Sequence, residues 1–331
     1  MSAAAMSRAP VPASTSSPSW RPPCGCGRAF GTGLWPPAAD RRRRATGRRF
    51  LLGQQKGFAM TETAGGSGYA TVDGLKIYYE LHGGAPTGGR TPMVLLPGGL
   101  MAIDTALVED LIPRFARSRP VVAIEPQGHG HTGDRGGPVT IDRMVEDTAG
   151  VLAHLGVGQA DFVGHSLGGL IAIGLAIHHP ARVRSVTTLG AFTMLEGMLP
   201  ELVKLQRDPS HQPSAELIPL LPTEADFAAW QENFRRHAPD PTAWEAVVVK
   251  LNAMLAEWQG WTAAELRGIR ARFLVAIGDN DFTRVEHAAE MARLIPGAQL
   301  AVLPGTTHMN IITRGAWLEP MIDARLAHDA G

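Results

Sequence analysis

A serine flanked by glycines is the residue in this chain best placed to do chemistry. Ser166 stands in Gly164-His165-Ser166-Leu167-Gly168, which matches the pattern G-x-S-x-G. An apolar run precedes the motif and an apolar helical pattern follows it, so the serine is expected on a tight strand-to-helix turn that exposes its hydroxyl. The glycines leave room for the neighbouring backbone. The N-terminus of the following helix would stabilise negative charge that develops on a substrate oxygen. A serine that only caps the helix is the alternative, but this context favours a nucleophile.

A serine hydroxyl becomes a good nucleophile only when a histidine accepts its proton and a carboxylate orients that histidine. His308 is the predicted base, because it follows the last predicted strand in a loop that can lie over Ser166. The side chain of His165 is expected to point away from the serine. The other histidines considered are expected to be structural or at the surface: His129, His131, His178 and His179.

Two aspartates, Asp279 and Asp281, follow the strand predicted at residues 273–277. Asp279 is expected to form the turn, because aspartate is a frequent turn residue. Asp281 lies further along the loop, with one predicted helix and one predicted strand between it and His308. We therefore predict a catalytic triad of Ser166, Asp281 and His308.

The negative charge that develops on a substrate carbonyl oxygen needs preorganised N–H donors. The backbone N–H of Leu167, directly after Ser166, is the first predicted donor. The loop at residues 97–100 is expected to supply the second donor. Gly99 is the first choice there, and Leu100 is the alternative.

Strand and helix patterns alternate through most of the chain from residue 69. This alternation predicts an α/β fold with a mostly parallel sheet and helices on both faces, because parallel neighbours need crossover connections. Ligands of such sheets bind beyond the carboxyl ends of the strands, which is where the candidate residues fall. Short apolar or alternating runs predict strands over 69–72, 76–81, 93–96, 121–124, 160–163, 183–189, 273–277 and 299–303. Helical spacing predicts helices over 105–115, 141–155, 167–179, 286–294 and 316–326.

The alternation is interrupted between about residues 192 and 267, which separate the sixth and seventh predicted strands. This stretch is rich in tryptophan, phenylalanine, methionine and proline. We expect it to form a small helical cap over the site, held to the body by most of its aromatic side chains. A cap so apolar predicts a largely hydrophobic pocket. No cationic cluster is placed to hold a phosphate or a second carboxylate.

Composition divides the chain of 331 residues into two parts. Residues 1–66 are rich in Ala, Pro, Ser, Gly and Arg without a helical or strand period, so we expect a disordered leader. An export signal, an organellar transit peptide and upstream sequence before a true start at Met60 are the three interpretations, and the last is favoured. Residues 67–331 are expected to form the folded domain. Cys24 and Cys26 lie in the leader and are too close together to staple the fold.

Charge is distributed unevenly, although basic and acidic residues each number 31. Ten basic residues and one acidic residue precede residue 57, which leaves 21 basic and 30 acidic residues, a charge of about −9, in the remainder. A body this acidic offers no electrostatic footprint for nucleic acid. No apolar run is long enough to span a membrane. We expect a cytoplasmic protein that binds a small-molecule substrate, and the sequence predicts no oligomeric state.

From about Tyr69 to the C-terminus the chain resembles the α/β-hydrolase superfamily. The resemblance is carried by the motifs at 96–99, 127–132, 164–169, 278–281 and 305–308, which read LPGG, QGHGHT, GHSLGG, GDND and GTTH. It is similar to the branch of small bacterial serine esterases, lactonases and cofactor-free haloperoxidase-like enzymes, which implies a site without metal or cofactor. Pro97 replaces a histidine that is common in the family, and Glu125 replaces a common aspartate. Both departures weaken any transfer of detailed substrate specificity.

The residues and the resemblance together predict a serine hydrolase. It is expected to cleave a neutral, largely apolar carboxylic ester, thioester or lactone through an acyl-enzyme on Ser166. The same triad supports carbon–carbon bond hydrolysis, acyl transfer or perhydrolysis, and sequence spacing does not separate these reactions. A ligand receptor with little turnover is a further alternative.

Overall fold

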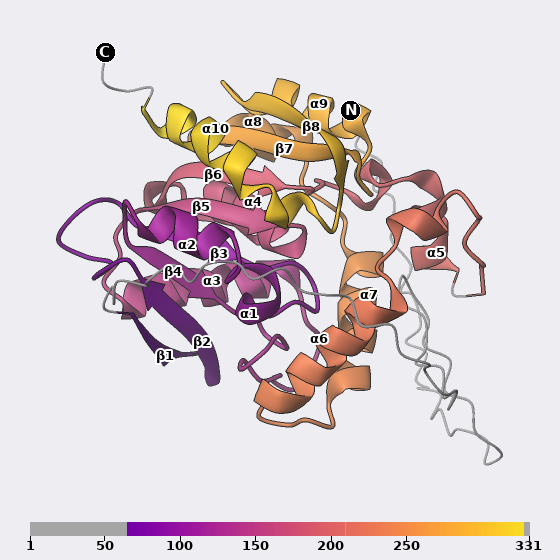
Figure 1. The fold of residues 1–331 in the computed structure, drawn as a ribbon, viewed down its shortest axis with the longest axis horizontal. Coiled ribbons are helices and arrows are strands. Elements are labelled where there is room, and N and C mark those ends of the chain that lie inside the picture. The colour runs from indigo at the N-terminus through magenta and orange to yellow at the C-terminus, as the bar shows by residue number, and fades with distance from the viewer. Residues whose placement is uncertain (1–64, 209, 328–331) are drawn as a thin grey trace, which may run out of the picture. The chain divides into compact units, whose positions relative to one another are not determined.

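An eight-stranded sheet forms the centre of the structure (Figure 1). The computed structural model describes residues 65–208 and 210–327. The strands are β1 (Gly66–Val72), β2 (Leu75–His82), β3 (Met93–Leu96), β4 (Val121–Ile124), β5 (Ala160–His165), β6 (Val183–Leu189), β7 (Arg272–Asn280) and β8 (Gln299–Thr307). Their order in the sheet is β1-β2-β4-β3-β5-β6-β7-β8. The predicted leader lies outside the described residues up to residue 64, and β1 already begins at Gly66.

The first two strands form the predicted hairpin. β1 pairs with β2 in antiparallel fashion, and Val72 lies opposite Leu75. Asp73 and Gly74 have positive φ angles of 43° and 75°, as the tight two-residue turn of a hairpin requires. β2 is also antiparallel to β4, whereas all neighbours from β4 to β8 run parallel. The sheet is therefore mostly parallel, as predicted.

Helices cover both faces of the sheet, as predicted. They are α2 (Leu111–Ala116), α3 (Ile141–His154), α4 (Leu167–His178), α8 (Ala263–Gly268), α9 (Val285–Leu294) and α10 (Gly315–Ala327). In front in Figure 1, α10 contacts α2 and β7, while α2 contacts β4. On the other face α3, α4, α8 and α9 contact one another in a row, and α4 packs on β3, β5 and β6. β3 and β4 are buried at every position, which explains their purely apolar sequences.

One predicted helix is wrong. Residues 105–115 do not form one continuous helix, because a turn at residues 107–110 separates two short helices, α1 (Ile103–Ala106) and α2. Pro113 lies in the first turn of α2, where a proline ring is tolerated. A helix continued back through residue 109 would bring that ring against a carbonyl and lose a hydrogen bond. Asp110 precedes α2 instead, and its Oδ2 accepts the N–H of Gly315.

The last two strands are longer than predicted. β7 extends to Asn280 and β8 extends to Thr307. Asp279 therefore lies within β7 and does not form the predicted turn. Its carboxylate accepts the N–H groups of Gly305 and Thr306 on β8. Asp279 thus joins the two strand ends.

The segment between β6 and β7 is mostly helical. It contains α5 (Pro200–Arg207), α6 (Glu224–His237), α7 (Trp244–Glu257) and α8. α7 contacts both α5 and α6. Trp230 and Phe234 are buried on α6, and the ring of Phe234 meets that of Trp244 edge-on, with centroids 5.5 Å apart. Aromatic packing of this kind holds the segment together.

The part of the chain that the structure describes has neither a membrane-spanning helix nor a cluster of metal-binding side chains. No helix there is long and apolar enough to cross a membrane. No three histidine, cysteine or acidic side chains gather there in a group that could hold a metal ion.

Candidate active site

Ser166 lies at the sharp turn between β5 and α4. Its backbone angles are φ 49° and ψ −115°, a sparsely populated region for a residue with a side chain. A Cβ atom at Gly164 would lie 2.2 Å from the carbonyl oxygen of Gly168, and a Cβ atom at Gly168 would lie 2.3 Å from that of Leu96. The tight turn expected from the glycine spacing is therefore present, and both glycines are sterically required.

Asp281 and His308 form a buried pair directly after β7 and β8. His308 Nδ1 lies 2.7 Å from Asp281 Oδ1, and the N–H of Thr283 donates to the same oxygen. Burial acts to raise the pKa of Asp281, but the positive charge of His308 and the hydrogen bonds from His308 and Thr283 outweigh it and lower the pKa. Asp281 is therefore an anion at neutral pH, and it can orient the imidazole through its Nδ1–H.

The same cavity wall carries both His308 and Ser166. The ring of Phe282 stacks on that of His308, with centroids 4.2 Å apart and planes 18° apart. Gly190 borders the pair closely, because a Cβ atom there would lie 2.8 Å from Asp281 Oδ2 and 2.9 Å from His308 Nδ1. The fold thus brings the serine, the aspartate and the histidine, which are far apart in the chain, to one end of the sheet.

His165 does not point away from the site, and that prediction is wrong. Its Nε2 lies 2.9 Å from the carbonyl oxygen of His308, the two imidazole ring centroids are 5.0 Å apart, and His165 is among the residues that line the cavity. Strand alternation would have separated His165 from Ser166, but the positive φ at Ser166 ends that alternation. Burial and then the nearby charge of His308 lower the pKa of His165 to about 3. The ring is therefore neutral, and its Nε2–H donates to the backbone carbonyl oxygen of His308, the proposed base.

Gly99 and Leu167, the predicted oxyanion donors, both line the cavity. Among the described residues, neither N–H group donates a hydrogen bond within the protein. The N–H of Leu100, the alternative donor, is already occupied, because it donates to Nε2 of His129 over 2.9 Å. Leu100 also has a positive φ of 65°. The N–H groups of Gly99 and Leu167 are thus the two that remain available to a substrate oxygen.

His129, in the loop after β4, is a structural residue that supports the loop carrying Gly99. It is fully buried, and burial lowers its pKa to about 4. The neutral ring accepts the N–H of Leu100 at Nε2, and its Nδ1 lies 2.9 Å from the carbonyl oxygen of Gln127. Neither His129 nor His131 lines the cavity, so both have the structural roles that were favoured from the sequence.

Glu125, which stands where the family often has aspartate, is buried behind the same loop. Its Oε1 accepts the N–H of Ile103 over 3.1 Å, and its Oε2 accepts the N–H of His131 over 2.5 Å. A Cβ atom at Gly130 would lie 2.2 Å from Oε1. The longer carboxylate therefore fits because residue 130 is a glycine, and the departure does not reach the cavity.

The cavity is apolar. It has a volume of about 780 Å³ with the open space at its mouth included. Apart from Ser166 and two histidines, the described residues that line it contribute aliphatic, methionine or aromatic side chains or glycine, and none is Lys, Arg, Asp or Glu. The segment between β6 and β7 supplies much of the wall, including Met198, Leu221, Trp230, Leu251, Met254 and Leu255. Such a cavity suits a neutral ligand, because a buried charge without a partner is costly.

The strand order, with a serine after β5, an aspartate after β7 and a histidine after β8, defines a protein with the α/β-hydrolase fold. The chain belongs to the alpha/beta hydrolase family, whose family model matches residues 93–319.

Curated relatives are similar over part of their length. The chain is 34% identical over 131 residues to the putative carbamate hydrolase RutD of Azorhizobium caulinodans, which covers 40% of this chain and 47% of that protein. It is 39% identical over 94 residues to a 2-hydroxymuconate semialdehyde hydrolase of Pseudomonas sp. strain CF600, covering 27% of this chain and 33% of that protein. The chain therefore spans less than half the length of either relative.

Solved structures share the fold over almost their whole length. The enol-lactonase from Burkholderia xenovorans LB400 has a TM-score of 0.62 and 22% identity, covering 78% of this chain and 99% of that chain. Est816, an N-acyl homoserine lactone degrading enzyme, has a TM-score of 0.59 and 26% identity, covering 77% of this chain and 99% of that chain.

Proposed function

We propose that this protein is a serine hydrolase that cleaves neutral, largely apolar carboxylic esters, thioesters or lactones through an acyl-enzyme on Ser166. The observation that carries the proposal is the buried 2.7 Å contact between His308 Nδ1 and Asp281 Oδ1, in a site where His308 and Ser166 line one cavity. A carboxylate that orients an imidazole beside a serine is the arrangement needed to activate the hydroxyl.

The proposed reaction has two halves. Ser166 Oγ attacks the carbonyl carbon and gives its proton to His308 Nε2, while Asp281 stabilises the imidazolium that forms. The N–H groups of Gly99 and Leu167 stabilise the negative charge on the carbonyl oxygen. The proton then moves from His308 to the departing alkoxide or thiolate, which leaves the acyl group on Ser166. Water, deprotonated by the same histidine, releases the acid and restores the serine.

The apolar wall supports a neutral substrate with an apolar acyl chain. A substrate carboxylate or phosphate inside the cavity would meet no cationic side chain among its described lining residues. The similarity to Est816, an N-acyl homoserine lactone degrading enzyme, supports lactones as part of this substrate class.

Hydrolysis of a panel of chromogenic neutral esters with short to long acyl chains, together with neutral lactones, tests the proposal. Ser166→Ala should lower kcat/KM by about a thousandfold or more, because triad members act as a unit. Ser67→Ala, on the edge strand β1, is the matched control and should retain full activity. A fully active Ser166→Ala variant would refute the proposal.

Product analysis with water, alcohol or peroxide as the acceptor separates hydrolysis from acyl transfer and perhydrolysis. A labelled 1,3-diketone substrate tests carbon–carbon bond cleavage. Stoichiometric binding without turnover across all substrates would instead favour a ligand receptor.

A further inference from the structure

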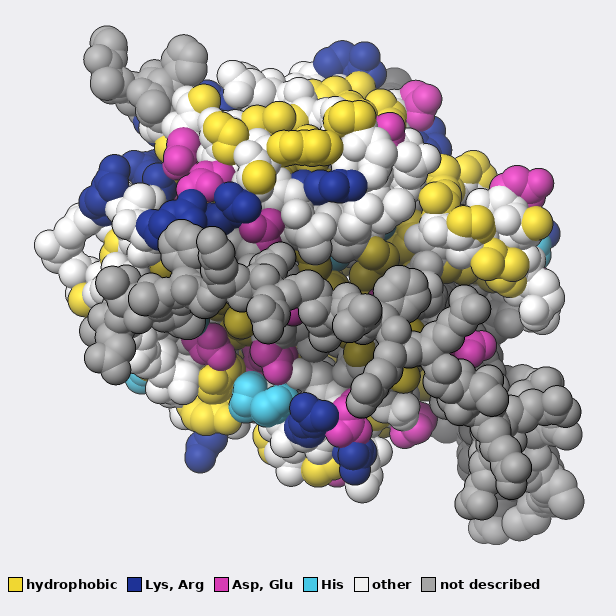
Figure 2. Space-filling model, in the orientation of Figure 1, with side chains coloured by type: hydrophobic (Ala, Val, Ile, Leu, Met, Phe, Trp, Pro, Cys, Tyr) yellow, Lys and Arg dark blue, Asp and Glu magenta, His cyan; other side chains and the backbone are white. Residues whose placement is uncertain are grey.

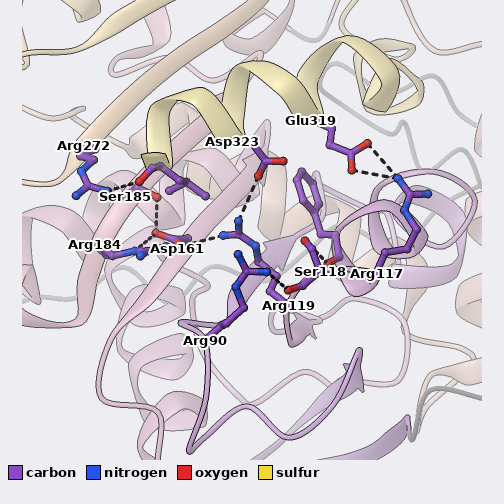
Figure 3. Close-up of polar contacts among 12 residues, drawn as sticks. Arg90, Arg117, Ser118, Arg119, Asp161, Arg184, Ser185, Arg272, Glu319 and Asp323 are labelled. Atoms are coloured by element: carbon purple, nitrogen blue, oxygen red, sulfur yellow. Dashed lines mark hydrogen bonds and ion pairs between the residues drawn. The ribbon is translucent and has the colours of Figure 1, made fainter. Parts of the chain in front are cut away.

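A second cavity, with a polar lining, lies at the end of the sheet opposite the candidate active site. Arg119 precedes β4 by two positions, Asp161 is the second residue of β5, and Arg184 is the second residue of β6. These positions are the amino ends of parallel strands, whereas the candidate catalytic residues follow the carboxyl ends. The side chains of all three residues meet beside α10 (Figure 3).

Asp161 is fully used in holding these strands together. It is 1% exposed, and its Oδ1 accepts hydrogen bonds from Arg184 Nε over 2.8 Å and from Ser185 Oγ over 2.7 Å. Its Oδ2 contacts Arg119 Nη1 over 3.2 Å and also pairs with Arg184 Nη2. Asp161 does not line the cavity, so one negative charge is fixed beneath its floor.

Arginines outnumber carboxylates around this cavity. Arg90, Arg119 and Arg184 line it, and Asp323 on α10 is the acidic side chain that lines it. With Asp161 included, three cationic groups face two anionic groups. Figure 2 shows dark-blue basic side chains gathered with magenta acidic ones on the left of the face drawn there. A local excess of positive charge is unusual in a body whose net charge is negative.

Donors in this cavity lack acceptors. Arg90 makes no ion pair within the described residues, and its Nη1 donates to the carbonyl oxygen of Ser118 over 2.6 Å. The side chain of Arg119 is 9% exposed, and its buried Nε has no hydrogen-bond partner in the part of the chain that the structure describes. Burial lowers the pKa of Arg119, Asp161 and Asp323 oppose this, and Arg184 and Arg90 lower the pKa further. The guanidinium groups are thus close enough to repel one another.

An oxyanion with several oxygens would relieve this repulsion. The planar guanidinium presents N–H donors in a fork that matches phosphate oxygens. The cavity has a volume of about 990 Å³ with open space included, and the hydroxyl-bearing Thr91 and Ser118 also line it. It therefore has room and donors for a phosphate group together with part of the molecule that carries it.

We propose that the cavity lined by Arg90, Arg119 and Arg184 binds a phosphate group, free or carried by a nucleotide. The bound anion would pair with donors at the amino ends of β4 and β6, and so would stabilise this end of the sheet. The site is independent of the proposed catalytic centre, because the two lie at opposite ends of the strands.

Isothermal titration calorimetry on the full chain tests this proposal, with sodium chloride holding the ionic strength constant. The probes are inorganic phosphate, pyrophosphate, ADP and adenosine. Saturable binding of one phosphate-bearing probe per chain, with no binding of adenosine, is the expected result. Tighter binding of ADP than of pyrophosphate would indicate a carried phosphate, and the reverse order would indicate a free one. Absence of saturable binding by all phosphate probes would overturn the proposal.

Three variants make the test specific. Arg90→Gln should weaken binding by about fivefold or more, because a charge-assisted hydrogen bond is lost. Asp323→Asn should tighten it, because a competing carboxylate is removed. Arg117→Gln is the matched control, since Arg117 is 62% exposed and pairs with Glu319 outside the cavity (Figure 3). An equal loss in Arg117→Gln and Arg90→Gln would show only nonspecific attraction.

Ester hydrolysis separates this site from the proposed function. Arg90→Gln should leave kcat and KM for a neutral ester unchanged, because Arg90 lies far along the strands from the candidate triad. Anion binding and hydrolysis can therefore each fail without the other.

Discussion

Replacing Ser166 by glycine should give a more stable protein than replacing it by alanine. The turn holds residue 166 at φ 49° and ψ −115°, and a residue with a Cβ atom in such a region costs about 1–3 kcal/mol. Glycine avoids this strain, although it loses roughly 0.5–1 kcal/mol more through the entropy of the unfolded chain. The difference leaves the glycine variant more stable by about 1 kcal/mol.

Urea unfolding of Ser166→Gly and Ser166→Ala measures this difference directly. Both variants lack the serine hydroxyl, so the comparison of their stabilities does not depend on catalysis. A difference of 1 kcal/mol should raise Tm by about 2–4 °C in a folded part of this size. Ala153→Gly, at an exposed position of α3 with ordinary helical backbone, is the control and should lose about 1 kcal/mol.

The opposite order would refute the reasoning. If Ser166→Gly were no more stable than Ser166→Ala while Ala153→Gly lost stability as expected, the turn at residue 166 would not be strained in solution. The exposure of the hydroxyl would then need another explanation than a backbone held in place by its neighbours.

Three further predictions concern the same site. Asp281→Asn should lower kcat for a neutral ester by about 10³–10⁴-fold. Asp279→Asn should lower kcat by less than about tenfold, because its exposed carboxylate only joins the ends of two strands. Similar losses of kcat in both variants would reject Asp281 as the catalytic acid. His129→Leu should lower kcat by about tenfold with little change in KM, because the N–H of Leu100 loses its acceptor, and an unchanged kcat would count against this. The folded-state pKa values of His129 and His165 are about 4 and about 3, so the unfolded chain binds more protons below about pH 6.5. As the pH is lowered from about 6 to 4.5, the free energy of unfolding should therefore fall by about 2 kcal/mol per pH unit. If His165→Gln showed the same dependence of unfolding free energy on pH, the buried histidines would not be its cause.

Local sequence was sufficient for the buried centre of the sheet. β3 and β4 were predicted to the residue, because a strand covered on both faces is a short apolar run, and here each run is bounded by proline or glutamate. The helix over 105–115 failed because apolar spacing continues through Pro113, whose effect depends on where in a helix it falls. The ends of β7 and β8 were missed because they depend on Asp279 bonding to Gly305, a contact between distant residues.

The candidate site divides in the same way. The five-residue motif is sufficient to single out Ser166 as the candidate nucleophile, and the loops after the last two predicted strands single out Asp281 and His308. The contact of His165 with the backbone of His308 spans 143 residues, and no local pattern indicates it.

Scattered arginines were equally invisible. Arg90, Arg119 and Arg184 lie far apart in the chain, and nothing in their spacing indicates that they meet. The order of the strands brings them together at the amino ends of β4, β5 and β6. The cavity lined by Ser166 and His308 has no cationic side chain among its described lining residues, so the two cavities differ in charge.

The separation of Ser166 from its proposed partners has a consequence during protein synthesis. A ribosome-bound chain completed through β6 carries the serine but neither the acid nor the base, because both follow the last two strands. Under the proposed function, the nascent chain cannot acylate itself on the thioesters and esters of the cell. Hydrolytic competence would begin only when β7 and β8 have joined the sheet, so the appearance of activity would report the addition of these two strands.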